Sequence, residues 1–288
     1  MLAPCSVAEA LAWAIPLLTS ALVPSPRLDA EVLLADVLHW RRSRLYARGE
    51  QPLDPEQVRL FVSAVVRRAE HEPVPYIIGR REFFALDFRV DGRVLIPRPE
   101  TELLVERVLA EAPGMAAEGV PVLIADIGTG SGIIAISIAA CLPRAVVTAT
   151  DISWDALCVA AHNAGLHNTK DRVHLVQGDL LGPLTQRVHV IAANLPYVPS
   201  SVLPSLARDV VAYEPMLALD GGDDGLRSIE RLLRVAGRHL LPRSMIVLEI
   251  GAGQGDAVIS LARRFYPNAR TKLHLDYAEQ ERIVEIRL

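Results

Sequence analysis

A glycine-rich segment near the middle of the chain is the clearest candidate for ligand chemistry. Residues 126–132 read Asp-Ile-Gly-Thr-Gly-Ser-Gly, between an apolar stretch typical of a strand and one typical of a helix. Glycine lets a backbone turn tightly and approach a ligand closely, because it has no Cβ. The spacing differs from the G-x-G-x-x-G of a dinucleotide site. The segment therefore predicts a binding loop, with a purely structural turn as the alternative.

Two carboxylates narrow the chemistry of this loop. Asp126 directly precedes the glycines, where it would repel a pyrophosphate and suit a cation such as the amino group of S-adenosylmethionine. Asp151 ends the next apolar stretch, where a carboxylate can accept hydrogen bonds from both ribose hydroxyls. Together they predict a nucleoside cofactor. Asp179 ends the third such stretch. It could lie near the adenine ring of a cofactor, and a helix cap or a solvated loop acid is an equally good interpretation.

Asn194-Leu195-Pro196-Tyr197 is the second candidate, because it follows the fourth apolar stretch and open α/β sheets bind ligands at the carboxyl ends of their strands. The asparagine oxygen and a fixed backbone carbonyl can accept two N–H bonds from a planar amide or amine. Pro196 would keep both acceptors aimed, and Tyr197 could cover the planar group. An Asx-type turn with a packed tyrosine is the alternative. The preceding cofactor loop favours a substrate site.

Other chemistry-bearing residues form no comparable pattern. The eight histidines are dispersed and the three cysteines have no CxxC spacing, so we predict no metal site. Arginines crowd the N-terminal region. Solvated helix faces are the simpler interpretation, and a docking surface for an RNA-containing or acidic partner is the alternative. These residues are Arg41, Arg42, Arg44, Arg48, Arg67, Arg68, Arg80 and Arg81.

The first seventy residues predict a small helical bundle. Capping patterns begin at Ser6, Ser25 and Asp54, and each precedes apolar residues at helical spacing. This predicts three short helices without strands.

The residues after this bundle have a composition typical of strands. Glu82–Ile96 is rich in aromatic and β-branched residues, and Asp91-Gly92 is expected to form the turn of a hairpin. Prolines make residues 95–100 a stiff connector. Thr101 is expected to cap a helix that starts at Glu102.

From residue 120 onward, strand-like and helix-like stretches alternate, which predicts a doubly wound α/β sheet with helices on both faces. The predicted strands are Pro121–Ala125, Ala145–Thr150, Val173–Val176, Val188–Ala193, Met245–Glu249, Lys272–Leu275 and Arg282–Arg287. The main predicted helices are Gly132–Cys141, Trp154–Gly165, Gly225–His239 and Gly255–Phe265.

Composition excludes several protein classes. Of 288 residues, 51% are hydrophobic and 22% charged, which suits a packed globular chain and excludes a disordered or collagen-like one. A net charge of -4 argues against a general polyanion binder. Three scattered cysteines (Cys5, Cys141 and Cys158) favour a reducing cytosol over a disulfide framework. With no targeting signal or membrane segment expected, we predict a cytoplasmic protein.

Several of these motifs together resemble the release-factor glutamine methyltransferases of the PrmC/HemK type. The resemblance spans nearly the whole chain in the expected order. The matching segments are Pro73–Gly79 with Glu82-Phe83-Phe84, Leu95–Glu102 (Leu-Ile-Pro-Arg-Pro-Glu-Thr-Glu), the loop Asp126–Gly132 and Ala218–Leu226.

This resemblance implies a fold, a reaction and a set of site residues. It implies an N-terminal helical substrate-recognition domain (1–80), a β-hairpin and Pro-rich linker (81–100) and a Rossmann-like methyltransferase domain with a mostly parallel seven-stranded sheet (101–288). The family transfers a methyl group from S-adenosylmethionine to the side-chain nitrogen of the Gln in the Gly-Gly-Gln loop of peptide-chain release factors, leaving S-adenosylhomocysteine. The implied cofactor residues are Gly128, Thr129, Gly130, Ser131, Gly132, Asp151, Leu180 and Asn194, and the implied substrate and catalytic residues are Asn194, Leu195, Pro196 and Tyr197.

The tetrapeptide departs from the usual Asn-Pro-Pro-Tyr of this family, because Leu195 replaces the first proline. Amino-group methyltransferases that act on adenine in RNA can carry Asn-Leu-Pro-Tyr, so an enzyme of that kind acting on RNA or DNA is the alternative. We expect the position to contribute only its backbone carbonyl, which leucine retains. The N-terminal and linker motifs favour a protein substrate. We expect a monomer, and the net charge of -4 argues against stable binding of nucleic acid.

Overall fold

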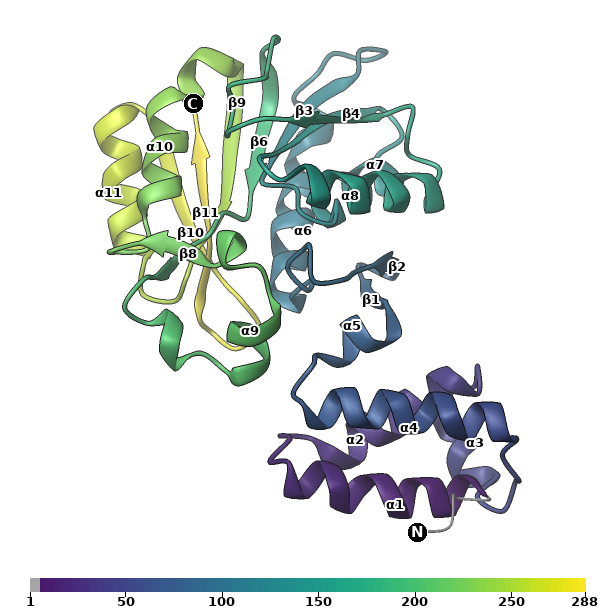
Figure 1. Cartoon of the computed structure of the whole chain (residues 1–288). Coiled ribbons are helices and arrows are strands. Elements are labelled where there is room, and N and C mark those ends of the chain that lie inside the picture. Colours follow the sequence, from purple (N-terminus) through teal and green to yellow (C-terminus); the bar gives the residue numbers. More distant parts are fainter. Residues whose placement is uncertain (1–5) are drawn as a thin grey trace. The chain divides into compact units, whose positions relative to one another are not determined.

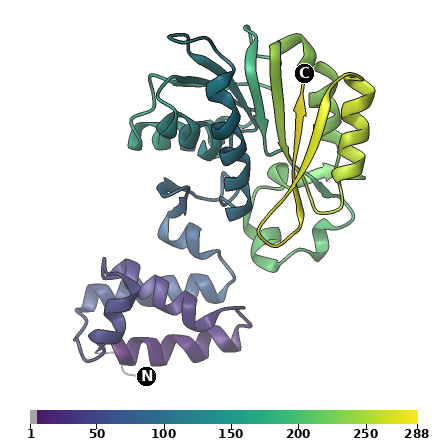
Figure 2. The same ribbon diagram turned by 180° about the vertical axis from the view of Figure 1, so that it is seen from behind.

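The computed structural model describes residues 6–288 and divides into two compact units, shown from opposite sides in Figures 1 and 2. The first unit comprises the residues up to Arg80 together with Ala207–Tyr213. The second comprises Arg81–Leu206 and Glu214–Leu288. The predicted division into 1–80, 81–100 and 101–288 stays a prediction, and Cys5 lies outside the described residues.

The first unit is built from helices around one apolar core (Figure 1). Asp54 begins a complete capping box with Gln57, as its sequence pattern predicts. Ser6 caps the first helix, whereas Ser25 makes no side-chain capping bond. The helices around this core are α1 (Val7–Ser20), α2 (Pro26–Val37), α3 (Arg42–Ala47), α4 (Pro55–Ala69) and α5 (Val74–Ile78). The short helix α9 (Arg208–Tyr213) also belongs to this unit but buries no residue in the core. The prediction of three helices in the first seventy residues was wrong, because α3 is a fourth helix there and is too short to show a helical period.

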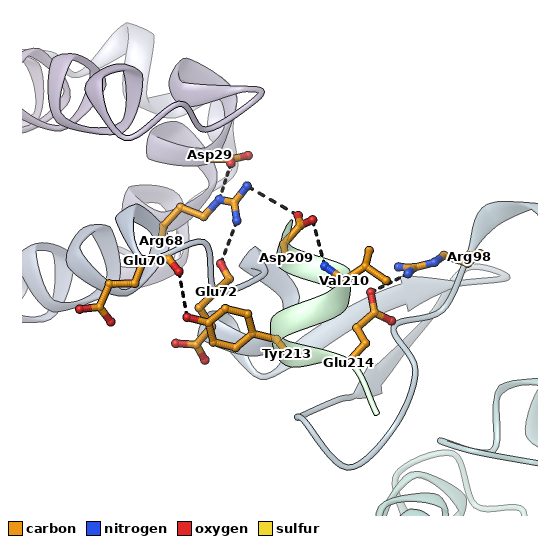
Figure 3. A network of polar contacts seen from close by, with 9 residues as sticks. All are labelled: Asp29, Arg68, Glu70, Glu72, Arg98, Asp209, Val210, Tyr213 and Glu214. Carbon is orange, nitrogen blue, oxygen red and sulfur yellow. Dashed lines mark hydrogen bonds and ion pairs between the residues drawn. The ribbon is translucent and has the colours of Figure 1, made fainter. Parts of the chain in front are cut away.

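Arg68 joins the distant parts of the first unit (Figure 3). Its guanidinium is nearly buried and donates to Asp29 at 2.7 Å and to the Glu72 carbonyl at 3.0 Å. Asp209 of α9 lies 3.9 Å from the same guanidinium, and the Tyr213 hydroxyl donates to the Glu70 carbonyl at 2.9 Å. These bonds hold residues 207–213 in the helical unit, although they follow α4 by more than a hundred residues.

The linker forms a hairpin from β1 (Arg80–Phe83) and β2 (Leu86–Arg89), but its turn lies at Phe84-Ala85. Placing the turn at Asp91-Gly92 was therefore wrong. Glu102 accepts a hydrogen bond from the Phe84 backbone, and the backbone of Arg89 pairs with the buried amide of Asn163 instead of continuing a strand. These tertiary bonds decide where the strands end.

The second unit is organised by a seven-stranded sheet in the order β10-β11-β9-β6-β3-β4-β5. β11 pairs antiparallel with both neighbours, and the other adjacent strands pair in parallel. The mostly parallel sheet expected from the sequence is thus confirmed. The strands are β3 (Val122–Ile127), β4 (Ala145–Asp151), β5 (Val173–Gln177), β6 (Val188–Ala193), β9 (Leu240–Glu249), β10 (Arg270–Leu275) and β11 (Glu281–Arg287).

Helices cover both faces of this sheet (Figures 1 and 2). Successive strand residues point to opposite faces, so Val190 and Ala192 pack with the first set of helices and Ile191 and Ala193 with the second. The first set is α6 (Glu102–Glu111), α7 (Ile133–Cys141) and α8 (Trp154–Leu166), and the second is α10 (Arg227–Ala236) and α11 (Gly255–Phe265).

Short elements complete the second unit. β7 (Val198–Pro199) and β8 (Asp220–Gly222) form a small parallel ribbon. The 3-10 turns are η1 (Pro99–Thr101), η2 (Ala112–Gly114), η3 (Leu203–Ser205), η4 (Met216–Ala218) and η5 (Gly237–His239). In residues 6–288, no helix is both long and apolar enough to cross a membrane.

The Arg68 network predicts a local stability effect. Arg68→Met should speed amide hydrogen exchange in residues 70–72 and 207–213 by about tenfold or more, because a hydrogen bond to a charged group contributes about 1.5–3 kcal/mol. Mass spectrometry of exchanged peptides measures this. Arg59→Met is the control, since it removes only a solvent-exposed ion pair with Glu56, and such pairs contribute little to stability. Unchanged exchange in the Arg68 variant would contradict the structural role assigned to this residue.

Candidate active site

A cavity of about 380 Å³ opens at the carboxyl ends of β3, β4 and β6. The direction in which successive strands are added to the sheet reverses here, because β4 lies on one side of β3 and β6 lies on the other. Such a switch point leaves a crevice in which open α/β sheets bind ligands. The cavity brings together Gly128, Thr129, Gly130, Ser131, Asp151, Leu180, Asn194, Leu195 and Pro196 of the predicted set.

The glycine loop turns sharply between β3 and α7. Gly128, Gly130 and Gly132 have φ of 73°, 55° and 86°, which side chains with a Cβ rarely adopt. A Cβ on Gly132 would lie 2.7 Å from the Ile136 side chain. Gly132 does not line the cavity but begins α7, so its role here is to let the loop turn tightly against the helix.

Asp126 holds the loop from behind. Its Oδ2 accepts hydrogen bonds from the Thr129 hydroxyl at 2.6 Å and the Ala135 backbone at 3.1 Å, and the side chain is fully buried. Burial raises the pKa of Asp126 to about 7. Because Asp126 does not line the cavity, the expectation that it faces a ligand cation was wrong. Its Oδ2 instead bonds the loop and the first turn of α7, and its Oδ1 is buried without a hydrogen-bond partner among the described residues.

Asp151 ends β4 and lines the cavity, where its sequence position predicts it. Its Oδ2 accepts from the Gly130 backbone at 2.8 Å and its Oδ1 from the Ser153 backbone at 2.9 Å. Burial raises its pKa, and these backbone bonds oppose that shift. Each carboxylate oxygen keeps a further lone pair, so Asp151 can still accept two hydroxyl groups.

Leu180 and Asp179 form another wall of the cavity. The Leu180 backbone has φ of 50° and its carbonyl accepts from the Thr150 hydroxyl at 2.9 Å, which holds this backbone against β4. Asp179 is half exposed and forms an ion pair with Arg231 at 2.5 Å. Asp179 thus lines the cavity, is open to solvent and is paired with Arg231.

Asn194 follows β6 and presents one end of its amide to the cavity. Its Nδ2 donates to Thr101 Oγ1 at 3.1 Å, so Thr101 serves this amide and makes no capping bond to α6. The expectation that Thr101 caps this helix was therefore wrong. Among the described residues no donor reaches Asn194 Oδ1, which leaves this oxygen available to a ligand.

Leu195 contributes more than its carbonyl. The side chain is 4% exposed, belongs to an apolar core, and would lie 3.1 Å from a Cβ on Gly128. The tetrapeptide and the glycine loop are thus packed against each other. The expectation that only the backbone of Leu195 matters is corrected by this burial, although the residue also lines the cavity.

Tyr197 lies behind the cavity wall rather than on its surface. Its hydroxyl donates to Glu249 Oε1 at 3.4 Å, and its carbonyl accepts from Gln254 Nε2 at 3.0 Å. Burial raises the pKa of Tyr197 to about 12, which keeps the phenol protonated. In this structure Tyr197 therefore supports the tetrapeptide.

A wall of the cavity comes from residues that the chemical patterns alone did not single out. Glu214, whose side chain is almost fully buried, accepts from Arg98 at 2.5 Å (Figure 3) and from the Ile96 backbone at 3.2 Å. The cavity-lining residues on either side of these bonds are Leu95, Pro97, Arg98, Pro215 and Leu217. In residues 6–288 no cluster of three His, Cys, Asp or Glu side chains could hold a metal ion.

Comparison with known proteins places the chain in a family. Residues 9–79 match the PrmC N-terminal domain and residues 100–223 match the methyltransferase small domain. The chain is 45% identical to the release factor glutamine methyltransferase of Moorella thermoacetica over 95% of both chains, and 39% identical to that of Geobacter sulfurreducens over 90% of this chain and 89% of the relative. The chain belongs to the release factor glutamine methyltransferase family.

Membership confirms the resemblance found in the motifs of the linker and loop. Solved structures agree on the fold, since the hMettl16 catalytic domain in complex with the MAT2A 3′UTR hairpin 6 superposes with a TM-score of 0.57 at 14% identity, covering 82% of this chain and 84% of that one. The Rossmann-like methyltransferase fold of this release factor glutamine methyltransferase family member is thus confirmed. The matched methyltransferase region contains the loop and the tetrapeptide but ends before Glu249.

The buried Asp126 predicts a pH-dependent stability. A carboxyl group whose pKa is higher in the folded than in the unfolded chain binds more protons when folded, so stability falls as pH rises from the ordinary value of 3.8 towards 7. Asp126→Asn removes this contribution, and the difference in melting temperature between pH 5 and pH 8 should shrink. Thermal unfolding of both proteins measures it. Asp256→Asn on α11 is the control, and an undiminished difference in the Asp126 variant would refute the assignment.

Proposed function

We propose that this protein transfers a methyl group from S-adenosylmethionine to the side-chain amide nitrogen (N5) of the Gln in the Gly-Gly-Gln motif of peptide-chain release factors. Family membership supports the reaction class and the substrate. The observation that carries the proposal is the free Oδ1 of Asn194, which faces the same cavity as the glycine loop and Asp151.

The cavity suits S-adenosylmethionine in size and chemistry. Pockets for ligands of this class occupy roughly 300–1,000 Å³, and this one has about 380 Å³. Asp151 would accept the ribose hydroxyls, and Leu180 would pack near the adenine. When bound, this cofactor supplies an electrophilic methyl carbon on a sulfonium. The proposed cofactor residues are Gly128, Thr129, Gly130, Ser131, Gly132, Asp151, Leu180 and Asn194.

The tetrapeptide would hold the substrate amide. Asn194 Oδ1 and the Leu195 carbonyl accept no hydrogen bond from the described residues, so both can accept the N–H groups of a glutamine side chain. An amide nitrogen is a poor nucleophile, because its lone pair is delocalised into the carbonyl. Two acceptors orient that nitrogen for in-line displacement and stabilise the positive charge that develops on it.

Pro196 and Tyr197 complete the proposed catalytic set. Pro196 stiffens the cavity wall between the acceptors and Tyr197. Tyr197 stays protonated and bonded to Glu249, so it positions the segment rather than removing a proton. In the described residues, the acids that line the cavity are Asp151, Asp179 and Asp220. Each already accepts hydrogen bonds or an ion pair, so loss of the proton to solvent after transfer fits this site.

The wider biological assignment follows from this activity. We place the protein in the cytoplasm, acting as a monomer on release factors in translation termination, without stable binding to nucleic acid or membrane. The net charge of -4 supports a protein substrate over a polyanion.

Cofactor affinity tests the role of Asp151. Asp151→Ala should weaken binding of S-adenosylmethionine by about 1.5–3 kcal/mol, since hydrogen bonds to a charged group are lost. Titration calorimetry measures the dissociation constant. Asp155→Ala, in the exposed first turn of α8, is the matched control and should bind normally. An unchanged affinity in a folded Asp151 variant would remove this residue from the cofactor site.

Methyl transfer tests the proposed reaction and the acceptor pair. The protein is incubated with methyl-labelled S-adenosylmethionine and a release factor, and separately with RNA and DNA. Mass spectrometry should find the methyl group on the Gly-Gly-Gln peptide. Asn194→Ala should lower turnover by about 10²–10³, because a group that stabilises the transition state is lost. Leu195→Pro keeps the carbonyl and should retain turnover, while losing on the order of 2 kcal/mol of stability with the buried side chain.

The outcomes of this assay separate the alternatives. Label on RNA or DNA with none on the release factor would replace the proposal with an amino-group methyltransferase that acts on nucleic acid. Full activity of Asn194→Ala together with loss of activity in Leu195→Pro would refute the acceptor pair and leave the substrate assignment intact.

A further inference from the structure

A buried carboxylate lies directly behind the tetrapeptide. Glu249 is the last residue of β9 and is 1% exposed. β9 runs parallel to β6, and Ala193 pairs with Leu248, so Glu249 lies beside Asn194 at the carboxyl edge of the sheet. Thr101, at the start of α6, is fully buried at the same place. Three segments distant in sequence thus meet at one point.

These residues can form a chain of hydrogen bonds. Asn194 Nδ2 donates to Thr101 Oγ1 at 3.1 Å. The Thr101 hydroxyl lowers the pKa of Glu249, and Glu249 Oε2 is buried without a hydrogen-bond partner among the described residues, so this oxygen can accept the Thr101 hydroxyl. The Tyr197 hydroxyl donates to Glu249 Oε1 at 3.4 Å. A single carboxyl group thus bonds one end of the tetrapeptide directly and can hold the other end through Thr101.

The charge of the Glu249 carboxylate determines which group donates in each of these hydrogen bonds. An ionised carboxylate only accepts, so the Thr101 hydroxyl must donate to it and offer its lone pairs to Asn194. The asparagine amide then points its NH2 group at Thr101 and its oxygen at the cavity. A protonated carboxyl group could donate to Thr101 instead, which would turn the hydroxyl hydrogen towards Asn194 and favour the opposite amide orientation.

Charged and titratable groups around Glu249 bear on its ionisation. Burial raises its pKa to about 7. Hydrogen bonds from Thr101 and Tyr197 and the positive charge of Arg282 on β11 lower it, while the negative charge of Glu100 in η1 raises it. The balance leaves the group able to change charge near neutral pH.

We propose that Glu249 and Thr101 are positioning residues for methyl transfer, which orient the Asn194 amide so that its oxygen faces the substrate nitrogen. The proposal deepens the function proposed above and rests on it. Glu249 stabilises both ends of the tetrapeptide without lining the cavity itself. It acts through Thr101 and Tyr197 rather than on the reacting atoms.

Substitution of Thr101 tests the proposal through kinetics. Thr101→Val keeps the shape but removes the hydroxyl, and should lower kcat by about 10²-fold, the loss expected from a displaced reacting group. The dissociation constant of S-adenosylmethionine should change by less than about threefold. Thr101→Ser restores the hydroxyl and should recover most of kcat. Thr169→Val removes another buried hydroxyl, bonded to the Ala164 carbonyl, and serves as the matched control with normal kcat.

Substitution of Glu249 tests the charge. In the wild type, kcat should rise as pH increases through about 7, because the carboxylate form orients Asn194 correctly. Glu249→Gln removes the charge with little change of shape. It should lower kcat and abolish this rise, while the fold stays intact by circular dichroism.

A second readout does not depend on the substrate. NMR of the Asn194 side-chain NH2 should show slow hydrogen exchange in the wild type and Thr101→Ser, and fast exchange in Thr101→Val. Normal kcat and slow exchange in Thr101→Val would overturn the positioning role. Absence of release-factor labelling by the wild type, with the expected exchange pattern, would instead overturn the proposed function and leave the orientation of Asn194 established.

Discussion

The second unit depends on one constraint: β4 and β6 lie on opposite sides of β3 and run parallel to it, so the carboxyl ends of all three strands meet at one edge of the sheet. The chain leaves β3 at the glycine loop, β4 at Asp151 and β6 at Asn194, so three separate turns meet around one cavity. No single turn holds enough groups to bind a nucleoside and a glutamine together. The packing of Leu195 against Gly128 joins two of these turns into one surface.

Two acids are buried close to this cavity at a cost in stability. Asp126 and Glu249 are both essentially inaccessible to solvent, and burial raises the pKa of each to about 7. A core of apolar residues would be more stable at neutral pH, because burying charge is unfavourable. Asp126 orders the glycine loop in return, and Glu249 accepts a hydrogen bond from Tyr197 of the tetrapeptide. Both acids are thus hydrogen-bonded to the segments that shape the cavity.

The chain path links the two units through a short stretch between the tetrapeptide and α10. Residues 207–213 fold with the helices of the first unit, and Glu214 begins the return to the second. Glu214 holds the backbone of Ile96 and the side chain of Arg98, so the first residue of the return orders a wall of the cavity (Figure 3). The last of the three places where the chain passes between the units thus lies directly beside residues that line the cavity.

The glycine loop, Asp151, the tetrapeptide, the alternation of strands and helices, and the family could all be recognised from the sequence. These features depend on local backbone chemistry and on periodic burial, which neighbouring residues encode. Only the tertiary structure decided that the hairpin turns at Phe84-Ala85, that Asp126 faces the loop, and that Thr101 bonds Asn194 rather than capping its helix. It also decided the place of Glu249 behind Tyr197. Thr101 and Asn194 are 93 residues apart, and Tyr197 and Glu249 are 52 apart, so these hydrogen bonds exist because of the strand order, which no local pattern records.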